Sequence, residues 1–208
     1  MSFAQELSGL LPADLPHRET VIRKSAAHLD LIVEANRTMN LTRIVGEREA
    51  AIKHVLDSVM PWRLFEGAGV VVDAGTGAGF PGIPLALVLP QTRFVLLESI
   101  QKKARFVAAA AEALEIPNVE VHAVRAEDWL KENRANLLTA RAVAPLSKAL
   151  PLFGPALRSG VRALLYKGPD AEQEIAEATK GKVSARVVLR YELPEGAGTR
   201  TIVEALGW

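Results

Sequence analysis

A run of alternating glycines is the segment whose residue types and spacing most plainly predict chemistry. Asp73, Gly75, Gly77 and Gly79 form the pattern D-x-G-x-G-x-G directly after the apolar residues 70–72. Because glycine has no side chain, the backbone of such a loop can approach a nucleotide closely. The segment therefore predicts a buried strand that runs into a ligand-binding turn and then into a helix.

The spacing of these glycines narrows the choice of ligand. A dinucleotide-binding loop, G-x-G-x-x-G, needs a glycine where this chain has Phe80, and no G-K-S or G-K-T follows to make a P-loop. The remaining pattern resembles the loop of S-adenosylmethionine (SAM) methyltransferases, with Asp73 and Glu98 on either side of the cofactor. Glu98 comes 19 residues after Gly79, where an acid that binds ribose hydroxyls is expected. The alternatives are a tight turn that binds nothing and, for Glu98, a solvated strand end.

Short β-rich runs that alternate with amphipathic stretches must position this loop. The β-rich runs are 70–72, 93–97, 119–121, 136–139 and 161–166, and the helical stretches include 102–114 and 146–157. This alternation predicts βαβ units and a mainly parallel sheet. Residues 185–191 and 199–206, joined by the turn 194–198, predict an antiparallel hairpin at the edge of the sheet.

The chain before this alternation has a helical pattern. Apolar side chains recur at helical spacing in two stripes, Val21, Ile22, Ala26, Leu29, Ile32 and Val33, then Ile52, Val55, Leu56 and Val59. We predict an α/β protein of the Rossmann-like methyltransferase fold, with a seven-stranded, mainly parallel sheet and a C-terminal hairpin. A helical extension over residues 1–66 would pack on a SAM-binding core over residues 67–208.

Composition narrows the function classes further. The chain has 208 residues, no cysteine, and four histidines (His17, His28, His54 and His122) that lack the short spacing of a metal site. We therefore expect neither disulfides nor a metal. No leader-like N-terminus and no long apolar run are present, so we expect a soluble, cytoplasmic monomer without membrane contact. The net charge of +1, from 25 basic and 24 acidic side chains, argues by itself against binding a polyanion through bulk electrostatics.

Several other segments follow patterns that general methyltransferases do not share. Residues 36–44 read N-x-x-x-N-L-T-x-I, residues 54–58 read H-x-x-D-S, and the glycine loop continues as F-P-G-I-P to residue 84. Further matching segments are 97–106, 125–128, 141–142 and 165–168. Together they resemble the bacterial methyltransferase family known as glucose-inhibited division protein B. The chain departs from the family at Glu98, where the family has Asp, and at Ala140, where it has Ser.

The resemblance implies an enzyme that methylates N7 of a guanine in the 530 loop of 16S ribosomal RNA, guanosine 527. It implies contacts with SAM at Gly75, Phe80, Ala126, Glu127 and Arg141, and at Glu98 through the ribose. The glycine-loop pattern adds Asp73, Gly77 and Gly79 to the cofactor-binding residues. Arg141 and Lys167 would lie near the reacting centre, and no residue would act as a base, because N7 carries no proton at neutral pH. A cation so close to the sulfonium of SAM is unfavourable unless its charge is directed at an acid or an RNA phosphate.

Other polar residues have two interpretations, contact with RNA or a purely structural role. The RNA candidates are Asn36, Arg37, Asn40, Arg43, His54, Asp57, Lys102, Lys103, Arg105 and Lys167. The two asparagines could instead cap the end of their helix. His54 and Asp57 could be joined by a hydrogen bond within an expected helix over 47–59, and this bond would tie the helical extension to the sheet. The cations could be solvated surface charges.

The partner would be 16S rRNA, within the small ribosomal subunit or an assembly intermediate. An alternative function is a SAM-binding ribosome-assembly or regulatory protein without catalysis. A small-molecule or protein methyltransferase has less support, because no N-P-P-Y-type segment follows the fourth strand, where the chain has Arg141 and Ala142. The acids Asp170, Glu172, Glu174 and Glu177 cluster late in the chain and are expected to lie away from the cofactor, which leaves its rim basic. Weak, shallowly salt-dependent binding to naked RNA would follow.

Overall fold

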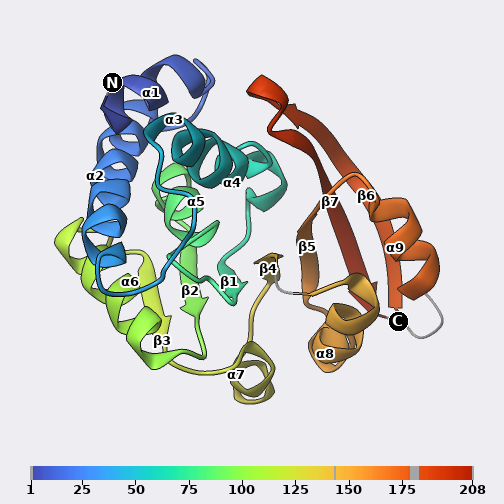
Figure 1. Cartoon of the computed structure of the whole chain (residues 1–208). Helices are drawn as coiled ribbons and strands as arrows, with labels where there is room; N and C mark the ends of the chain where they lie inside the picture. The colour runs from blue at the N-terminus through green and yellow to red at the C-terminus, as the bar shows by residue number, and fades with distance from the viewer. Residues whose placement is uncertain (1, 143, 179–182, 208) are drawn as a thin grey trace.

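The computed structural model describes residues 2–142, 144–178 and 183–207. One seven-stranded sheet has the order β3-β2-β1-β4-β5-β7-β6 (Figure 1). Its strands are β1 (Val70–Ala74), β2 (Arg93–Leu97), β3 (Val119–His122), β4 (Leu137–Arg141), β5 (Arg162–Lys167), β6 (Val183–Leu193) and β7 (Gly198–Gly207). The first five are parallel, and β7 is antiparallel to both β5 and β6. The predicted parallel sheet with a C-terminal hairpin is confirmed.

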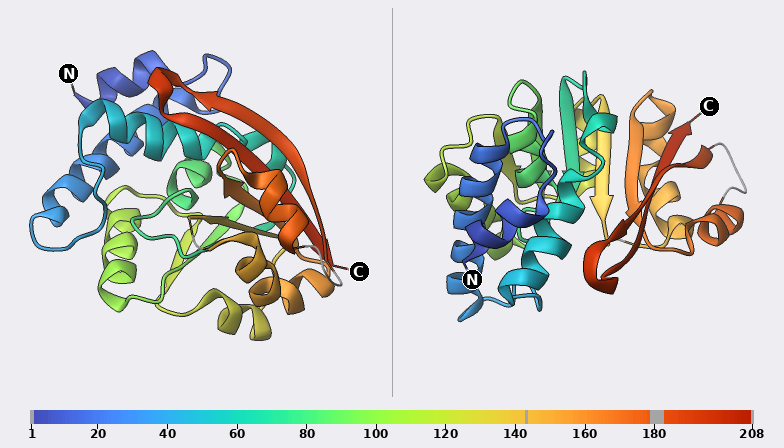
Figure 2. Two further views of the ribbon diagram at one scale, coloured as in Figure 1. Left: turned by 45° about the vertical axis from the view of Figure 1, so that its right-hand side comes forward. Right: turned by 90° about the horizontal axis from the view of Figure 1, so that it is seen from above.

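Helices cover both faces of the sheet (Figure 2). One face carries α1 (Phe3–Leu10), α2 (Arg18–Asn36), α3 (Glu47–Ala50), α4 (Asp57–Val59), α5 (Gly82–Val88) and α6 (Gln101–Ala113). The other carries α7 (Ala126–Glu132), α8 (Leu146–Arg158) and α9 (Ala171–Ala178). Short 3-10 turns lie at η2 (Trp62–Phe65) and η3 (Pro194–Gly196). No described helix is long and apolar enough to cross a membrane.

Alternation along the strands divides the core into two layers. Val71 and Leu96 pack under the N-terminal helices, whereas their neighbours Val72 and Leu97 pack under α7, α8 and α9. All four side chains are fully buried, as expected for central strands of a parallel sheet covered on both faces. The carboxyl ends of β1, β2, β3 and β4 therefore meet at one edge, where the glycine loop begins.

The N-terminal layer departs from the sequence pattern in two places. Val33, which the first stripe includes, is 37% exposed, because the stripe ends against the core at Ile32. The expected regular helix over 47–59 is interrupted by a π-helical segment, η1 (Ala51–Leu56), between α3 and α4. There the peptide N–H of Asp57 bonds to the carbonyl of Ile52, five residues earlier. An apolar stripe does not distinguish these two windings, because its spacing suits the α-helix and the structure buries the same apolar residues in the π-helix.

Candidate functional site

The glycine loop has a backbone that only glycine adopts readily. Gly75, Gly77 and Gly79 have φ values of +71°, +62° and +102°. The N–H of Gly75 donates to the carbonyl of Leu97 at 2.8 Å, which ties the loop to the end of β2. A Cβ at Gly79 would lie 2.7 Å from Ile83 Cδ1, whereas a Cβ at Gly77 would meet nothing within 4 Å. The loop is therefore packed on its inner side and open at Gly77.

Two carboxylates hold the loop from either side. Asp73 is fully buried, and its Oδ2 accepts hydrogen bonds from Thr76 Oγ1 at 2.6 Å and from the N–H of Gly82 at 2.9 Å. Glu98 accepts from the N–H of Gly77 at 3.1 Å through Oε2 and from the N–H of Ile100 at 2.8 Å through Oε1. The predicted contact of Glu98 with a ribose stays a prediction.

The residues of the loop fit a cofactor that carries a cationic group. Asp73 Oδ1 is a buried acceptor without a hydrogen-bond partner in the described part of the chain. Burial raises the pKa of Asp73 to about 6, although the hydrogen bonds from Thr76 and Gly82 oppose that shift. An ammonium group such as that of SAM would satisfy this acceptor.

The other predicted cofactor residues lie at the same edge of the sheet. Ala126 and Glu127 begin α7, a few residues after β3 ends, and Ala126 is buried. Glu127 keeps a side chain 23% exposed and lies 3.7 Å from Arg125 Nη1. Both residues thus stand beside the carboxyl ends of the strands that carry the glycine loop and Glu98.

Phe80, at the end of the loop, is held between two histidines. The ring of His54 stacks on it at 4.6 Å between centroids and 7° between planes, and the ring of His28 lies 5.0 Å away. Burial lowers the pKa of His28 to about 4 against an opposing effect of the Ala78 backbone. Burial and then the charge of Arg141 lower the pKa of His54 to about 3. Both rings are therefore neutral at pH 7.

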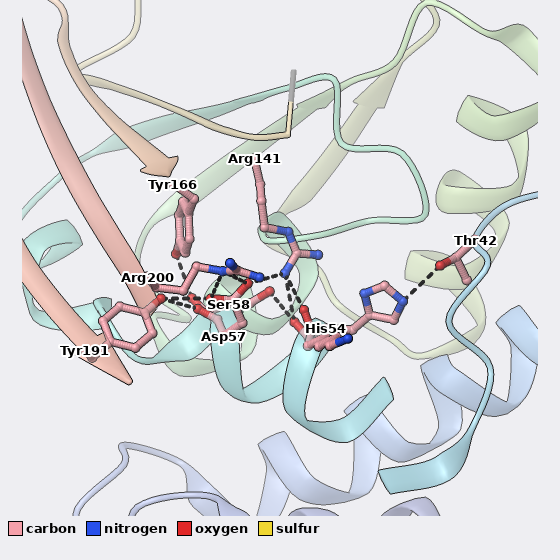
Figure 3. A network of polar contacts seen from close by, with 9 residues as sticks. Thr42, His54, Asp57, Ser58, Arg141, Tyr166, Tyr191 and Arg200 are labelled. Atoms are coloured by element: carbon pink, nitrogen blue, oxygen red, sulfur yellow. Dashed lines mark hydrogen bonds and ion pairs between the residues drawn. The ribbon is translucent and has the colours of Figure 1, made fainter. Parts of the chain in front are cut away.

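Arg141 leaves the end of β4 and reaches a buried carboxylate (Figure 3). Its Nη1 lies 3.1 Å from Asp57 Oδ2, and its Cζ lies 5.5 Å from the ring centroid of Phe80. Asp57 is fully buried and also accepts from Arg200 Nε at 3.1 Å and from the hydroxyl of Tyr191 at 3.0 Å. Asp57 is thus buried and occupied by these partners, so a structural role fits it better than RNA contact. It ties the N-terminal layer to the sheet instead, through partners other than His54.

The π-helical segment η1 contributes to this network through its backbone. In an α-helix the carbonyl of Lys53 would accept from the N–H of Asp57, but that N–H bonds to Ile52 here. Arg141 Nη1 donates to the Lys53 carbonyl at 2.8 Å. The Lys53 carbonyl of η1 and the carboxylate of Asp57, the first residue of α4, therefore face one guanidinium.

A cleft of about 670 Å³ opens beside Arg141. Its polar lining comes from Lys53, His54, Asp57, Arg141, Lys167, Glu174 and Arg200, together with Tyr166. Lys167 Nζ donates to the Ala144 carbonyl at 2.6 Å and to Glu174 Oε2 at 2.8 Å, with a side chain only 10% exposed. The expectation that the late acids lie away from the site is wrong for Glu174, because α9 packs its side chain against Lys167.

Comparison with known proteins identifies the family of the chain. The sequence pattern of the family GidB, rRNA small subunit methyltransferase G, matches residues 21–202. The ribosomal RNA small subunit methyltransferase G of Solibacter usitatus is 67% identical over 208 residues, which span 98% of this chain and 99% of that protein. This chain belongs to that family.

Other relatives agree with this membership. The methyltransferase G of Pelotomaculum thermopropionicum is 40% identical over 166 residues, which span 77% of this chain and 70% of that protein. The solved structure of an O-methyltransferase from Bacillus cereus in complex with SAH has a TM-score of 0.61 at 20% identity, covering 99% of this chain and 96% of that one. That likeness concerns the fold. Family membership makes the chain a methyltransferase and agrees with the predicted cofactor, SAM.

The N-x-x-x-N-L-T segment of the family forms the loop after α2. Asn36 Nδ2 donates to the Thr42 carbonyl at 2.6 Å, and Asn36 Oδ1 accepts from the N–H of Leu41 at 2.8 Å. Thr42 Oγ1 in turn lies 3.1 Å from His54 Nε2. Both Asn36 and His54 are thereby occupied in holding this loop over the site, so the structural interpretation fits them better than RNA contact. Asn40 is exposed at the tip of the loop.

The candidate cations fall into two groups. Arg37 is exposed and pairs with Glu34 at 3.0 Å, and Arg43 is exposed in the loop over the site. Lys102 and Arg105 are exposed and Lys103 is half-buried in the first turns of α6, immediately after Glu98 and Ile100. In the described part of the chain these three residues of α6 make no ion pair, so their charges are available to an anionic partner. Their contact with RNA stays a prediction.

Two site residues were not expected from the sequence. Arg200 and Tyr191 come from β7 and β6 and reach Asp57 across sequence separations of 143 and 134 residues. Both belong to a hairpin whose pattern predicts only an edge of the sheet. A partly apolar strand that carries an arginine is too common a pattern to have revealed either of them.

Proposed function

We propose that this member of the family transfers the methyl group of SAM to N7 of a guanine in the 530 loop of 16S rRNA, guanosine 527. The name of the relatives supports small-subunit rRNA as the substrate. The observation that carries the proposal is the cleft of about 670 Å³ beside Arg141, whose guanidinium carbon lies 5.5 Å from the ring of Phe80 at the end of the glycine loop. Such a cleft has room for a single base that leaves its stack, as enzymes acting on bases require.

The reaction needs alignment rather than proton transfer. When bound, SAM supplies a methyl group on a positively charged sulfonium. The lone pair of guanine N7 forms the new bond in line with the bond to sulfur, and no proton is removed, so a general base has no role. The described residues agree with this scheme, since His28 and His54 are buried in packing roles around Phe80.

Lys167 is positioned to recognise the guanine. Two of its three N–H donors are used by the Ala144 carbonyl and Glu174, which leaves one for a ligand in the cleft. Guanine presents O6 beside N7 on the same edge, and O6 accepts hydrogen bonds. Donation from Lys167 to O6 would orient N7 toward the methyl group.

The form of the substrate is also part of the proposal. The protein would act as a monomer. Its substrate would be the small ribosomal subunit or an assembly intermediate rather than naked RNA, because its net charge of +1 gives little general attraction to RNA. Residues 1–66 would be a helical extension on a SAM-binding core of residues 67–208. The family loop around Asn36 and Thr42, which belongs to this extension, would cover the cleft from one side.

Methylation of ribosomal particles tests the function. Small subunits from cells that lack the protein are treated with the protein and SAM, and borohydride and aniline then cleave the RNA at 7-methylguanine. Cleavage in the 530 loop is the expected result, with Lys167→Met reducing its rate at least tenfold at unchanged SAM affinity. Binding of SAM without methyl transfer to subunits or to naked RNA would favour a non-catalytic assembly protein instead.

A further inference from the structure

Arg141 places a permanent positive charge beside the loop expected to hold the cofactor. Its guanidinium carbon lies 5.5 Å from the ring of Phe80, which ends the glycine loop. The side chain is only 15% exposed, so water screens its charge poorly. The sulfonium of SAM would be a second positive charge close to that of Arg141. S-adenosylhomocysteine (SAH), the product left after methyl transfer, has a neutral thioether in place of the sulfonium. A bare guanidinium here would therefore disfavour the substrate form of the cofactor relative to the product form.

Asp57 supplies the opposing negative charge. Its carboxylate is fully buried and lies 3.1 Å from Arg141 Nη1. Arg200 Nε lies 3.1 Å from both carboxylate oxygens, and the hydroxyl of Tyr191 donates to Oδ1 at 3.0 Å. The group of Asp57, Arg141 and Arg200 therefore carries a net charge of +1, which would become +2 without the carboxylate.

The π-helical segment η1 adds to the same effect. The carbonyl oxygens of Lys53 and His54 lie 2.8 Å and 3.5 Å from Arg141 Nη1. Carbonyl oxygens are the negative ends of peptide dipoles, so they stabilise the guanidinium and fix its direction. The charge of Arg141 is thus directed at the N-terminal layer and away from the edge of the sheet where the cofactor would lie.

We propose that Asp57 is a positioning residue that sets the preference of the site for SAM over SAH, by directing and neutralising the charge of Arg141. This inference rests on the proposed placement of the cofactor beside Phe80 and Arg141. A stronger preference for SAM matters for turnover, because SAH competes with SAM for the same site after each reaction. The alternative is that Asp57 serves only to tie the layers together, and then its removal would weaken both ligands alike.

Calorimetric binding of SAM and SAH separates these alternatives. The variants are Asp57→Asn, the double variant Asp57→Asn/Arg141→Gln, and the matched control Asp14→Asn, which breaks an exposed pair with Arg63. We expect Asp57→Asn to weaken SAM relative to SAH on the order of tenfold, and the double variant to restore the wild-type ratio. Asp14→Asn should leave the ratio unchanged. Sinefungin, which carries an ammonium in place of the sulfonium, should follow SAM.

Several results would overturn the inference. An unchanged SAM-to-SAH ratio in Asp57→Asn, or a ratio that the second substitution does not restore, would leave Asp57 with a structural role only. If Asp57→Asn does not fold, Arg141→Gln alone decides, because it should shift the ratio toward SAM, and no shift would refute the inference. Failure of the wild-type protein to bind either ligand would instead refute the proposed placement of the cofactor.

Discussion

Two histidines whose pKa is lowered by burial pack around Phe80. His28 is fully buried between Phe80 and Phe106, with ring centroids 5.0 Å and 6.4 Å away. Its pKa of about 4 reflects the cost of charging an imidazole in this environment. The ring also lies against the inner side of the glycine loop, since its Cε1 is 3.0 Å from the position that a Cβ on Gly79 would take. The protonation state of this ring therefore affects the stability of the fold.

Acid should destabilise the protein through these histidines. In the unfolded chain His28 regains a pKa near 6.5, so below that pH the unfolded state takes up a proton that the folded state refuses until about pH 4. The free energy of unfolding should fall by about 2 kcal/mol between pH 7 and pH 5 on account of His28 alone. Asp73 acts in the opposite direction, because its folded pKa of about 6 exceeds the unfolded value of 3.8.

Comparison with His28→Leu isolates this contribution. Chemical denaturation of both proteins between pH 5 and pH 7 cancels the effects of Asp73 and His54, which the variant retains. The stability of His28→Leu should depend less on pH than that of the wild type. Parallel stability curves for the two proteins would show that burial does not suppress the pKa of His28.

The sequence revealed the residues of the site that are close together in the chain. Spacing alone indicated Asp73, the glycines and Glu98, since one loop and one strand end determine their positions. The partners of Asp57 could not be predicted in the same way, because Arg200 lies 143 residues away and only the folded sheet brings the two together. Spacing also suggested that Asp57 pairs with His54, but no hydrogen bond joins them, and Asp57 points to Arg141 instead.

At the scale of elements, the junction between the glycine loop and α5 is tightly packed. A Cβ at Gly82 would lie 2.8 Å from Asp73 Oδ2 and 2.8 Å from Leu96 Cγ. Gly82→Ala should therefore destabilise the protein by about 1–3 kcal/mol. It should also weaken SAM binding, because the Asp73 carboxylate must move. Thermal unfolding measures the loss of stability, and calorimetry measures the loss of SAM affinity.

Gly9 provides the matched control for this substitution. It lies in α1, and a Cβ there would meet nothing within 4 Å. Gly9→Ala should leave SAM affinity unchanged and leave stability equal or raise it by up to about 1 kcal/mol, since alanine favours the helix. If both alanine variants behave alike, packing at the loop junction does not determine the shape of the cofactor site.

Elements could be predicted where hydrophobic periodicity distinguishes them. The alternation of β-rich and amphipathic runs located the strands and the helices on both faces, and turn residues located the hairpin. The π segment η1 could not be found this way, because the apolar side chains of residues 51–56 follow a spacing that also suits a regular α-helix. The π segment is accompanied by a tertiary contact that periodicity does not encode, the hydrogen bond from Arg141 to the Lys53 carbonyl.

Over the whole molecule, charges are nearly balanced but unevenly distributed. Many surface cations are paired, such as Arg63 with Asp14, Lys131 with Asp128 and Arg190 with Glu172. Lys102, Lys103 and Arg105 at the start of α6 have no such acid among the described residues and follow directly on the edge that carries Glu98. The net charge of +1 therefore describes the average surface rather than the rim of the site.

Replacement of the three α6 cations by glutamine should weaken RNA binding selectively. We expect a several-fold higher KM for small subunits and unchanged SAM affinity. If each cation contacts one phosphate of a single strand, the slope of log binding constant against log salt concentration should become shallower by about two. A triple glutamine variant of Arg63, Lys131 and Arg190 is the control for net charge. Equal effects of the two triple variants, or nanomolar wild-type binding to unstructured RNA at physiological salt, would contradict this view.

The contact between the C-terminal hairpin and Asp57 has a consequence for how the protein is made. Asp57 is synthesised 143 residues before Arg200, an interval on the order of ten seconds at bacterial translation rates. Throughout that interval the nascent N-terminal layer holds an acid whose partners from β6 and β7 do not yet exist. From the emergence of β4 onward, Arg141 can pair with this carboxylate, but the contacts from Tyr191 and Arg200 are still missing. The full set of partners of Asp57 is therefore complete only once the ribosome has nearly finished the chain.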